Sequence, residues 1–122
     1  MLAEAQTQAL QAAFDSIRKR APSVTHDAFA AAAAGCDVHP VTVDGAVVGA
    51  VLVKGPEIHA CVAETARGRW LTRRVLGILR GVIEQHGKAI TRATTQEGAA
   101  FVKRLGFSPV GGLWIKEARH GL

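Results

Sequence analysis

The hydrophobic pattern of this chain changes its period near residue 36, and this change limits the possible folds more than any other feature. Before it, apolar residues recur at helical spacing, as Leu10, Phe14 and Ile17 do. After it, the pattern becomes strand-like and is divided by short turns. We therefore expect helices over 4–20 and 25–34, with Gly35 closing the second, followed by a strand region.

Two short turns divide the strand region into three parts. Asp44-Gly45 is typical of a two-residue hairpin, and Gly55-Pro56 indicates a second turn. Pro40 indicates an open edge or an irregularity in the first strand, and the apolar second strand is expected to be buried on both faces. The sequence thus predicts an antiparallel meander of strands over 37–43, 46–54 and 57–63.

The remaining residues predict a crossover and a closing hairpin. An amphipathic helix is expected over 71–86, stopped by Gly87, with Gly77 and Gly81 allowing a close approach to the sheet. A right-handed crossover would place the next strand parallel to the third. The last elements are a strand over 88–94, a helix over 96–105 capped by Thr94 and Glu97, and a hairpin of 107–110 with 113–116. The fold class is therefore α+β, a mixed central sheet flanked by helices.

Length and composition indicate one domain. The chain has 122 residues, of which 48% are hydrophobic and 20% charged, as in globular proteins. We expect a single domain over 1–122, with a helical part over 1–35 and a sheet-helix core over 36–116. No apolar run is long enough for a membrane span, and the N-terminus does not resemble a secretory signal. A cytoplasmic location is expected, with Cys36 and Cys61 as thiols.

The net charge of +5 and the pI near 9.9 favour anionic partners. The chain has no tyrosine and only six Phe and Trp residues in total, so a stacking platform for nucleic acid is poorly supplied. Nucleic acid is thus an unlikely partner. A metal site built from Cys36, His39, His59 and Cys61 is also unlikely, because the first two point to opposite faces of a strand.

A basic loop joins the third strand to the long helix. It contains Arg67, Gly68 and Arg69. The first turn of a helix has unpaired N–H groups and the positive end of the dipole, both of which attract phosphate. Glycine permits close approach, and arginine adds bidentate donors. The alternative is a tight turn with solvated arginines, and a solvated helix face is the preferred interpretation of Arg73, Arg74 and Arg80.

At this point the chain resembles the GNAT superfamily of N-acetyltransferases over about residues 36–116. In that family an R/Q-x-x-G-x-G/A motif wraps the pyrophosphate of acetyl-CoA, and a later helix ends in an aromatic-x-x-x-x-G-F pattern. EIHACVAETARGRW (57–70) looks like the region that leads into the first motif, and GAAFVKRLGF (98–107) is similar to the second. Short alanine-rich chains of this type also resemble GNAT-like proteins of bacteriophages.

The resemblance implies an N-acyltransferase that uses acetyl-CoA or another acyl-CoA and transfers the acyl group directly to an amine of a small molecule or protein. The cofactor would contact Val62, Arg67, Gly68, Arg69, Trp70, Leu71 and Thr72. Glu57, His59 and Cys61 alternate onto one strand face, where Glu57 or His59 would take the proton of the amine. The alternative is a partly buried polar face with satisfied hydrogen bonds.

Several positions depart from the family pattern. Trp70 and Thr72 occupy the glycine positions of the motif, and Thr95 stands where asparagine is frequent. Val102 occupies the position of the tyrosine that protonates the leaving thiolate, and the usual first strand is missing. Whether the chain is an enzyme is therefore open. The alternative function is a catalytically inactive GNAT-fold module for binding, assembly or a phage virion.

Overall fold

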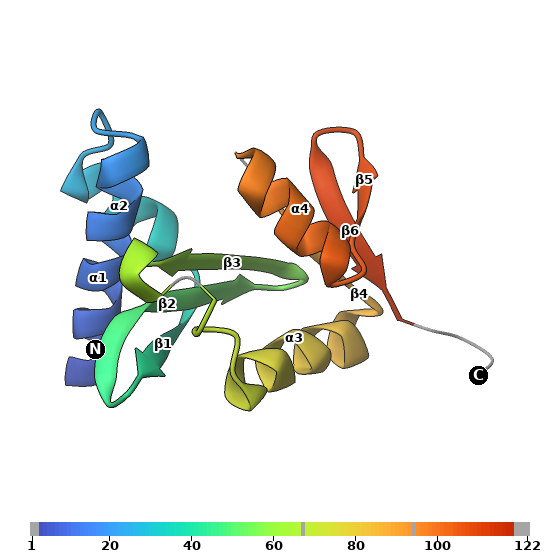
Figure 1. The fold of residues 1–122 in the computed structure, drawn as a ribbon, viewed down its shortest axis with the longest axis horizontal. Coiled ribbons are helices and arrows are strands. Elements are labelled where there is room, and N and C mark those ends of the chain that lie inside the picture. The colour runs from blue at the N-terminus through green and yellow to red at the C-terminus, as the bar shows by residue number, and fades with distance from the viewer. Residues whose placement is uncertain (1–2, 67, 94, 119–122) are drawn as a thin grey trace.

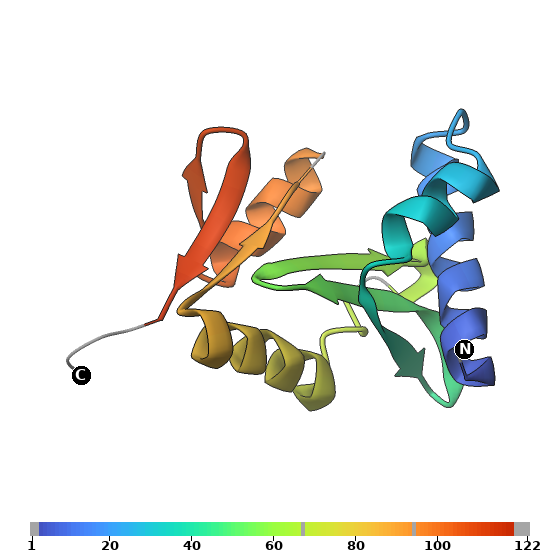
Figure 2. The same cartoon turned by 180° about the vertical axis from the view of Figure 1, so that it is seen from behind.

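The computed structural model describes residues 3–118 except 67 and 94. Six strands form one mixed sheet in the order β1-β2-β3-β4-β6-β5, and helices cover it. The fold class is therefore α+β, as predicted (Figures 1 and 2). The elements are α1 (Glu4–Arg20), α2 (His26–Ala33), β1 (Asp37–Val43), β2 (Ala46–Lys54), β3 (Glu57–Val62), the 3-10 helix η1 (Glu64–Ala66), α3 (Arg73–His86), β4 (Lys88–Thr91), α4 (Gln96–Arg104), β5 (Ser108–Val110) and β6 (Leu113–Glu117).

The predicted antiparallel meander is confirmed. β1 pairs with β2, and β2 with β3, both antiparallel. Asp44 and Gly45 both have positive φ, 53° and 80°, as the tightest hairpin turns require. β3 ends at Val62, one residue before the predicted end, and lies inside the sheet between β2 and β4.

A β-bulge lies in the first hairpin. The register shifts between Val41, which pairs with Gly49, and Thr42, which pairs with Val47, so Val48 is the extra residue of β2. The expected irregularity thus exists, but it lies beyond Pro40. The bulge also reverses the alternation of side chains along β2, because Val47 packs with the α1 side of the sheet and Val48 with the α3 side.

Two core clusters lie on opposite faces of the sheet. The first core cluster joins α1 and α2 to the meander and is formed by Ala9, Ala13, Phe14, Phe29, Ala33, Val38, Ala50, Leu52 and Cys61. The second core cluster joins α3 and the C-terminal part to the other face and is formed by Val41, Val51, Ile58, Val75, Leu79, Val82, Ala89 and Phe107. The middle of β2 is buried from both sides, as predicted, whereas its ends are more exposed.

Local capping sets the ends of the helices. α1 has its predicted bounds, and the side chain of Thr25 accepts a hydrogen bond from the Ala28 amide at the start of α2. The C-cap of α2 is Ala34 rather than Gly35. α3 begins at Arg73, two residues later than predicted, because Thr72 caps it by accepting from the Val75 amide at 3.3 Å. Its predicted stop is confirmed, since Gly87 has a φ of 78°.

The predicted roles of Gly77 and Gly81 and the predicted N-cap of α4 were wrong. A Cβ at Gly77 or Gly81 would meet nothing within 4 Å, so these glycines do not bring α3 close to the sheet. The residue that caps α4 is Thr95, which accepts from the Gly98 amide at 3.0 Å. The predicted cap Thr94 lies outside the described residues. β4 ends at Thr91, earlier than expected, and the final hairpin follows the predicted positions closely.

Gly49, next to the bulge, lies so close to the backbone of β3 that we expect it to tolerate no side chain. A Cβ there would overlap the backbone oxygen of Cys61 and lie 2.7 Å from the Cα of Val62, so β3 would have to move away from β2. We expect Gly49→Ala to lower the free energy of unfolding by about 2 kcal/mol or more. The matched control is Gly81→Ala in the open middle of α3, which should raise it by about 0.5–1 kcal/mol. Urea denaturation measures both, and equal effects would contradict the close approach.

Candidate functional site

β3 and β4 are paired where β3 begins, and they then diverge. In the described part of the chain they have a single registered pair, Glu57 with Ile90, and the Ile90 amide donates to the Pro56 carbonyl at 2.8 Å. This confirms the predicted parallel pairing, but only at the first residue of β3. Beyond it the two strands point in different directions (Figures 1 and 2). The sheet is therefore split on the side where β3 ends.

The split leaves one edge of β3 without a strand partner. The Ala63 amide donates to the Val48 carbonyl, so in the antiparallel pattern Ala63, Cys61 and His59 direct their backbone groups toward β2. The N–H and C=O groups of Ala60 and Val62 then point toward β4, and no described strand pairs with them. An extended ligand that carries amide groups could hydrogen-bond to this edge.

An apolar hollow lies next to this edge, between the sheet, α3 and α4. Twelve side chains line it, and Thr91 is the only one of them that carries a hydroxyl, carboxyl, amide or amino group. The lining residues are Val51, Ile58, Ala60, Trp70, Leu71, Val75, Leu79, Thr91, Phe101, Val102, Leu105 and Phe107. We refer to this feature as the apolar hollow.

An aromatic pair flanks the apolar hollow. Trp70 precedes α3, and Phe101 lies in α4; their ring centroids are 5.3 Å apart, with an angle of 44° between the rings. Trp70 thus fills the first glycine position of the family motif with a ring that packs against α4. The sequence shows both aromatic residues but gives no sign that they touch.

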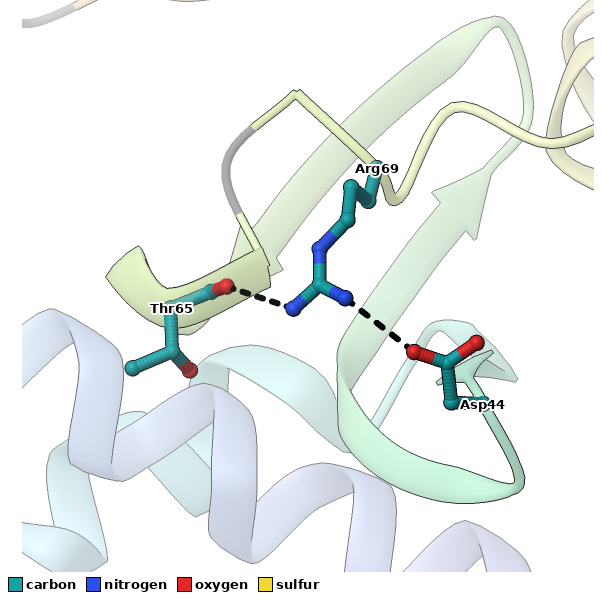
Figure 3. A network of polar contacts seen from close by, with 3 residues as sticks. All are labelled: Asp44, Thr65 and Arg69. Atoms are coloured by element: carbon teal, nitrogen blue, oxygen red, sulfur yellow. Dashed lines mark hydrogen bonds and ion pairs between the residues drawn. The ribbon is translucent and has the colours of Figure 1, made fainter.

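The loop between β3 and α3 holds most of the predicted cofactor residues. Gly68 has a φ of 83° and is exposed, so glycine is suited to this position. Arg69 donates to the Asp44 carboxylate at 3.1 Å and to the Thr65 carbonyl at 3.0 Å (Figure 3). Its guanidinium therefore holds the loop to the β1–β2 turn, a contact that the sequence did not indicate. Arg67 lies outside the described residues.

The other predicted cofactor residues lie around the start of α3. Leu71 and Trp70 line the apolar hollow, and Thr72 is the N-cap of the helix. Val62 is half-buried and packs against the second core cluster. The structure thus brings Val62, Trp70 and Leu71 to one region, whereas the side chain of Arg69 is directed to the β1–β2 turn.

The first turn of α3 carries unfavourable charge. Arg73 and Arg74 are its first two residues, both are exposed, and the turn contains no acidic residue. Cations at the positive end of a helix dipole are destabilising by a few tenths of a kcal/mol each. An anion bound there would interact favourably with both arginines and with the free N–H groups.

The candidate bases lie on the opposite face of β3 from the apolar hollow. Cys61 belongs to the first core cluster and Ile58 to the second, so by strand alternation Glu57 and His59 share the α1 side with Cys61. Both side chains are half-buried. The predicted common face is thus present, and both side chains remain partly accessible on it.

Burial keeps His59 neutral at neutral pH. It lowers the pKa of His59 from its ordinary value of 6.5; the Glu57 carboxylate opposes this shift and Arg92 adds to it. A neutral imidazole can accept a proton. Burial also raises the pKa of Cys61 and of Cys36, so both remain thiols and are weak nucleophiles.

The described residues contain no group of three or more His, Cys, Asp or Glu side chains suited to a metal ion. Nor does any helix among them combine the length and hydrophobicity needed to cross a membrane.

Comparisons with known proteins add little to this geometry. No family model matches the chain, and no curated protein matches it. Among solved structures, the chain is similar to one described as a "putative acetyltransferase from Agrobacterium tumefaciens", with 17% identity over 83% of this chain and 88% of that one. The TM-score is 0.43, so this likeness supports no statement about activity. None of these findings bears on a bacteriophage source.

The His59 environment predicts a pH dependence of stability. Because the folded protein binds the His59 proton less tightly than the unfolded chain, the free energy of unfolding should fall as the pH drops through 6.5. The loss should be complete once the pH is below the lowered pKa of the folded state. Urea denaturation between pH 8 and pH 5 measures the change. His59→Gln should make it smaller, and an unchanged pH dependence in that variant would contradict the assigned shift.

Proposed function

We propose that the protein is an acyl-CoA-dependent N-acyltransferase of the GNAT type that transfers the acyl group directly to an amine. The observation that carries this proposal is the split between β3 and β4, which leaves the backbone of Ala60 and Val62 without a strand partner among the described residues on the side of the apolar hollow. The strand and helix order of the structure is also the order that the sequence resemblance implies over residues 36–116. In this proposal the split is the donor site.

The donor site has groups suited to each part of an acyl-CoA. The free edge of β3 can hydrogen-bond to the amides of the pantetheine arm. The start of α3, with Arg73 and Arg74, can hold the pyrophosphate. Gly68 and the adjoining Arg67 remain predicted ligands. Arg69 would have to leave Asp44 to reach a phosphate, and because this ion pair is exposed the exchange costs little, so Arg69 also remains a predicted ligand.

Acyl-CoA supplies an activated thioester, and the chain supplies proton transfer. His59, neutral at pH 7, or Glu57 takes the proton of the attacking amine on the α1 side of β3. No side chain that could donate a proton occupies position 102, since Val102 lines the apolar hollow there. Water or another side chain must then protonate the departing thiolate, so the transfer should be slow.

A non-catalytic binding or assembly role is the second candidate. The observation that favours it is the combination of Val102 at the acid position with Trp70 packed on Phe101 next to the donor site. The two candidates differ in turnover, and they need not differ in CoA binding.

Coenzyme A binding tests the proposal directly. We expect Arg73→Ala/Arg74→Ala to weaken CoA binding by at least about tenfold, because a single well-formed charged hydrogen bond to phosphate contributes about 1.5–3 kcal/mol and tenfold corresponds to about 1.4 kcal/mol. Arg80→Ala, an exposed arginine farther along α3, is the matched control and should bind like wild type. Isothermal titration measures the three affinities. Absence of CoA binding in wild type would refute the proposed function.

Position 102 tests whether the protein is an enzyme. Val102→Tyr adds a hydroxyl where the family has its acid, whereas Val102→Phe adds the same bulk without it. With acetyl-CoA and a panel of amines, we expect the Tyr variant to turn over at least about tenfold faster than the Phe variant, since a positioned acid contributes about 10²–10⁴-fold. If wild type and both variants are inert while CoA binds, the non-catalytic role is the better account.

A further inference from the structure

The apolar hollow has an exposed rim and a buried floor. Ala60, on the β3 edge that faces β4, is exposed. Its cross-strand partner Val51 and, from the C-terminal part, Phe107 are only 1% and 4% exposed, because they belong to the second core cluster. A ligand group that enters the hollow beside Ala60 would therefore rest against buried apolar side chains.

The chemistry of the lining selects an apolar group. Apart from the hydroxyl of Thr91, the hollow offers aliphatic and aromatic surface. Besides that hydroxyl, only the indole N–H of Trp70 could pair with a polar group, so a polar group placed there would lose its hydration for few hydrogen bonds, whereas each methylene group would gain stability from leaving water. Trp70 and Phe101 add two ring surfaces along its side.

The position of the hollow relative to the candidate bases also matters. Glu57 and His59 lie on the α1 side of β3, and the hollow lies on the α3 side. If the carbonyl carbon of the thioester lies in the split, its sulfur leads to the pantetheine arm along the edge of β3, and its acyl carbon chain can extend to the α3 side, into the hollow. The amine attacks from outside the plane of the thioester group, and an approach from the α1 side brings it near Glu57 and His59. The tetrahedral intermediate then expels the CoA thiolate.

We propose that the apolar hollow binds the acyl chain of the donor, and that the donors of this protein are acyl-CoA thioesters with chains of several carbons in preference to acetyl-CoA. The inference rests on the proposed function, because it places the thioester in the split between β3 and β4. Ala60 is the specificity-determining residue at the entrance. The small side chain there leaves the hollow open.

Binding of a chain-length series tests this inference. Isothermal titration with CoA and with acetyl-, butyryl-, hexanoyl- and octanoyl-CoA should show affinity rising by up to about fourfold per added methylene, until the hollow is filled. Ala60→Leu narrows the entrance and should remove most of this gain, which is measured within each variant as the ratio of the octanoyl-CoA affinity to the CoA affinity. The matched control Ala46→Leu, at an exposed position at the start of β2, should retain the full gain.

The outcomes separate the inference about the acyl chain from the proposed function on which it rests. CoA binding with equal affinity for all chain lengths would overturn the inference and leave the proposed function in place. A full gain in Ala60→Leu would also overturn it. Failure of CoA and all four thioesters to bind wild type would overturn the proposed function and the inference with it. If circular dichroism shows that Ala60→Leu is unfolded, Val102→Phe fills the hollow from α4 and should remove the gain in its place.

Discussion

One parallel contact joins the two parts of the sheet, and the candidate site depends on where that contact ends. The Ile90 amide donates to the Pro56 carbonyl, and Glu57 pairs with Ile90. On one side lie the meander and the two N-terminal helices; on the other lie β4, α4 and the hairpin. Because the pairing stops after one registered pair in the described structure, the edge of β3 that faces β4 is open along most of its length, whereas the other edge pairs fully with β2.

The C-terminal part must be held in place by other contacts. Phe107 lies in the second core cluster together with residues of α3 and of the meander. Lys116 donates to the Leu105 carbonyl at 2.6 Å and so connects the hairpin to the end of α4. Side-chain packing from one face thus replaces the strand pairing that the split removes. The apolar hollow lies where that packing is incomplete.

Local signals in the sequence predicted most of the elements. The Asp44-Gly45 turn and the helix stop at Gly87 depend on short-range geometry, which single residues reveal. The roles of Gly77 and Gly81 were wrong because both glycines lie off the apolar stripe of α3, whose buried residues Val75, Leu79 and Val82 face the sheet. The bulge at Val48 could not be read from the run AVVGAVLVK, since almost every residue in it is apolar.

The site was predictable only in part. The placement of Glu57, His59 and Cys61 on one face follows from strand alternation. The Trp70–Phe101 and Arg69–Asp44 contacts join positions about 30 and 25 residues apart, and no local pattern encodes them. The same holds for the apolar hollow, whose lining comes from β2, β3, α3, β4 and α4 as well as from the segments between them.

The packing of Trp70 against Phe101 gives the molecule an optical reporter. The chain has two tryptophans and no tyrosine, so its near-ultraviolet emission comes from Trp70 and Trp114. Trp70 lines the apolar hollow, whereas Trp114 lies in β6 and packs against the second core cluster without lining the hollow. In a Trp114→Phe background, the fluorescence of the protein would report on one side of the hollow alone, without any attached dye.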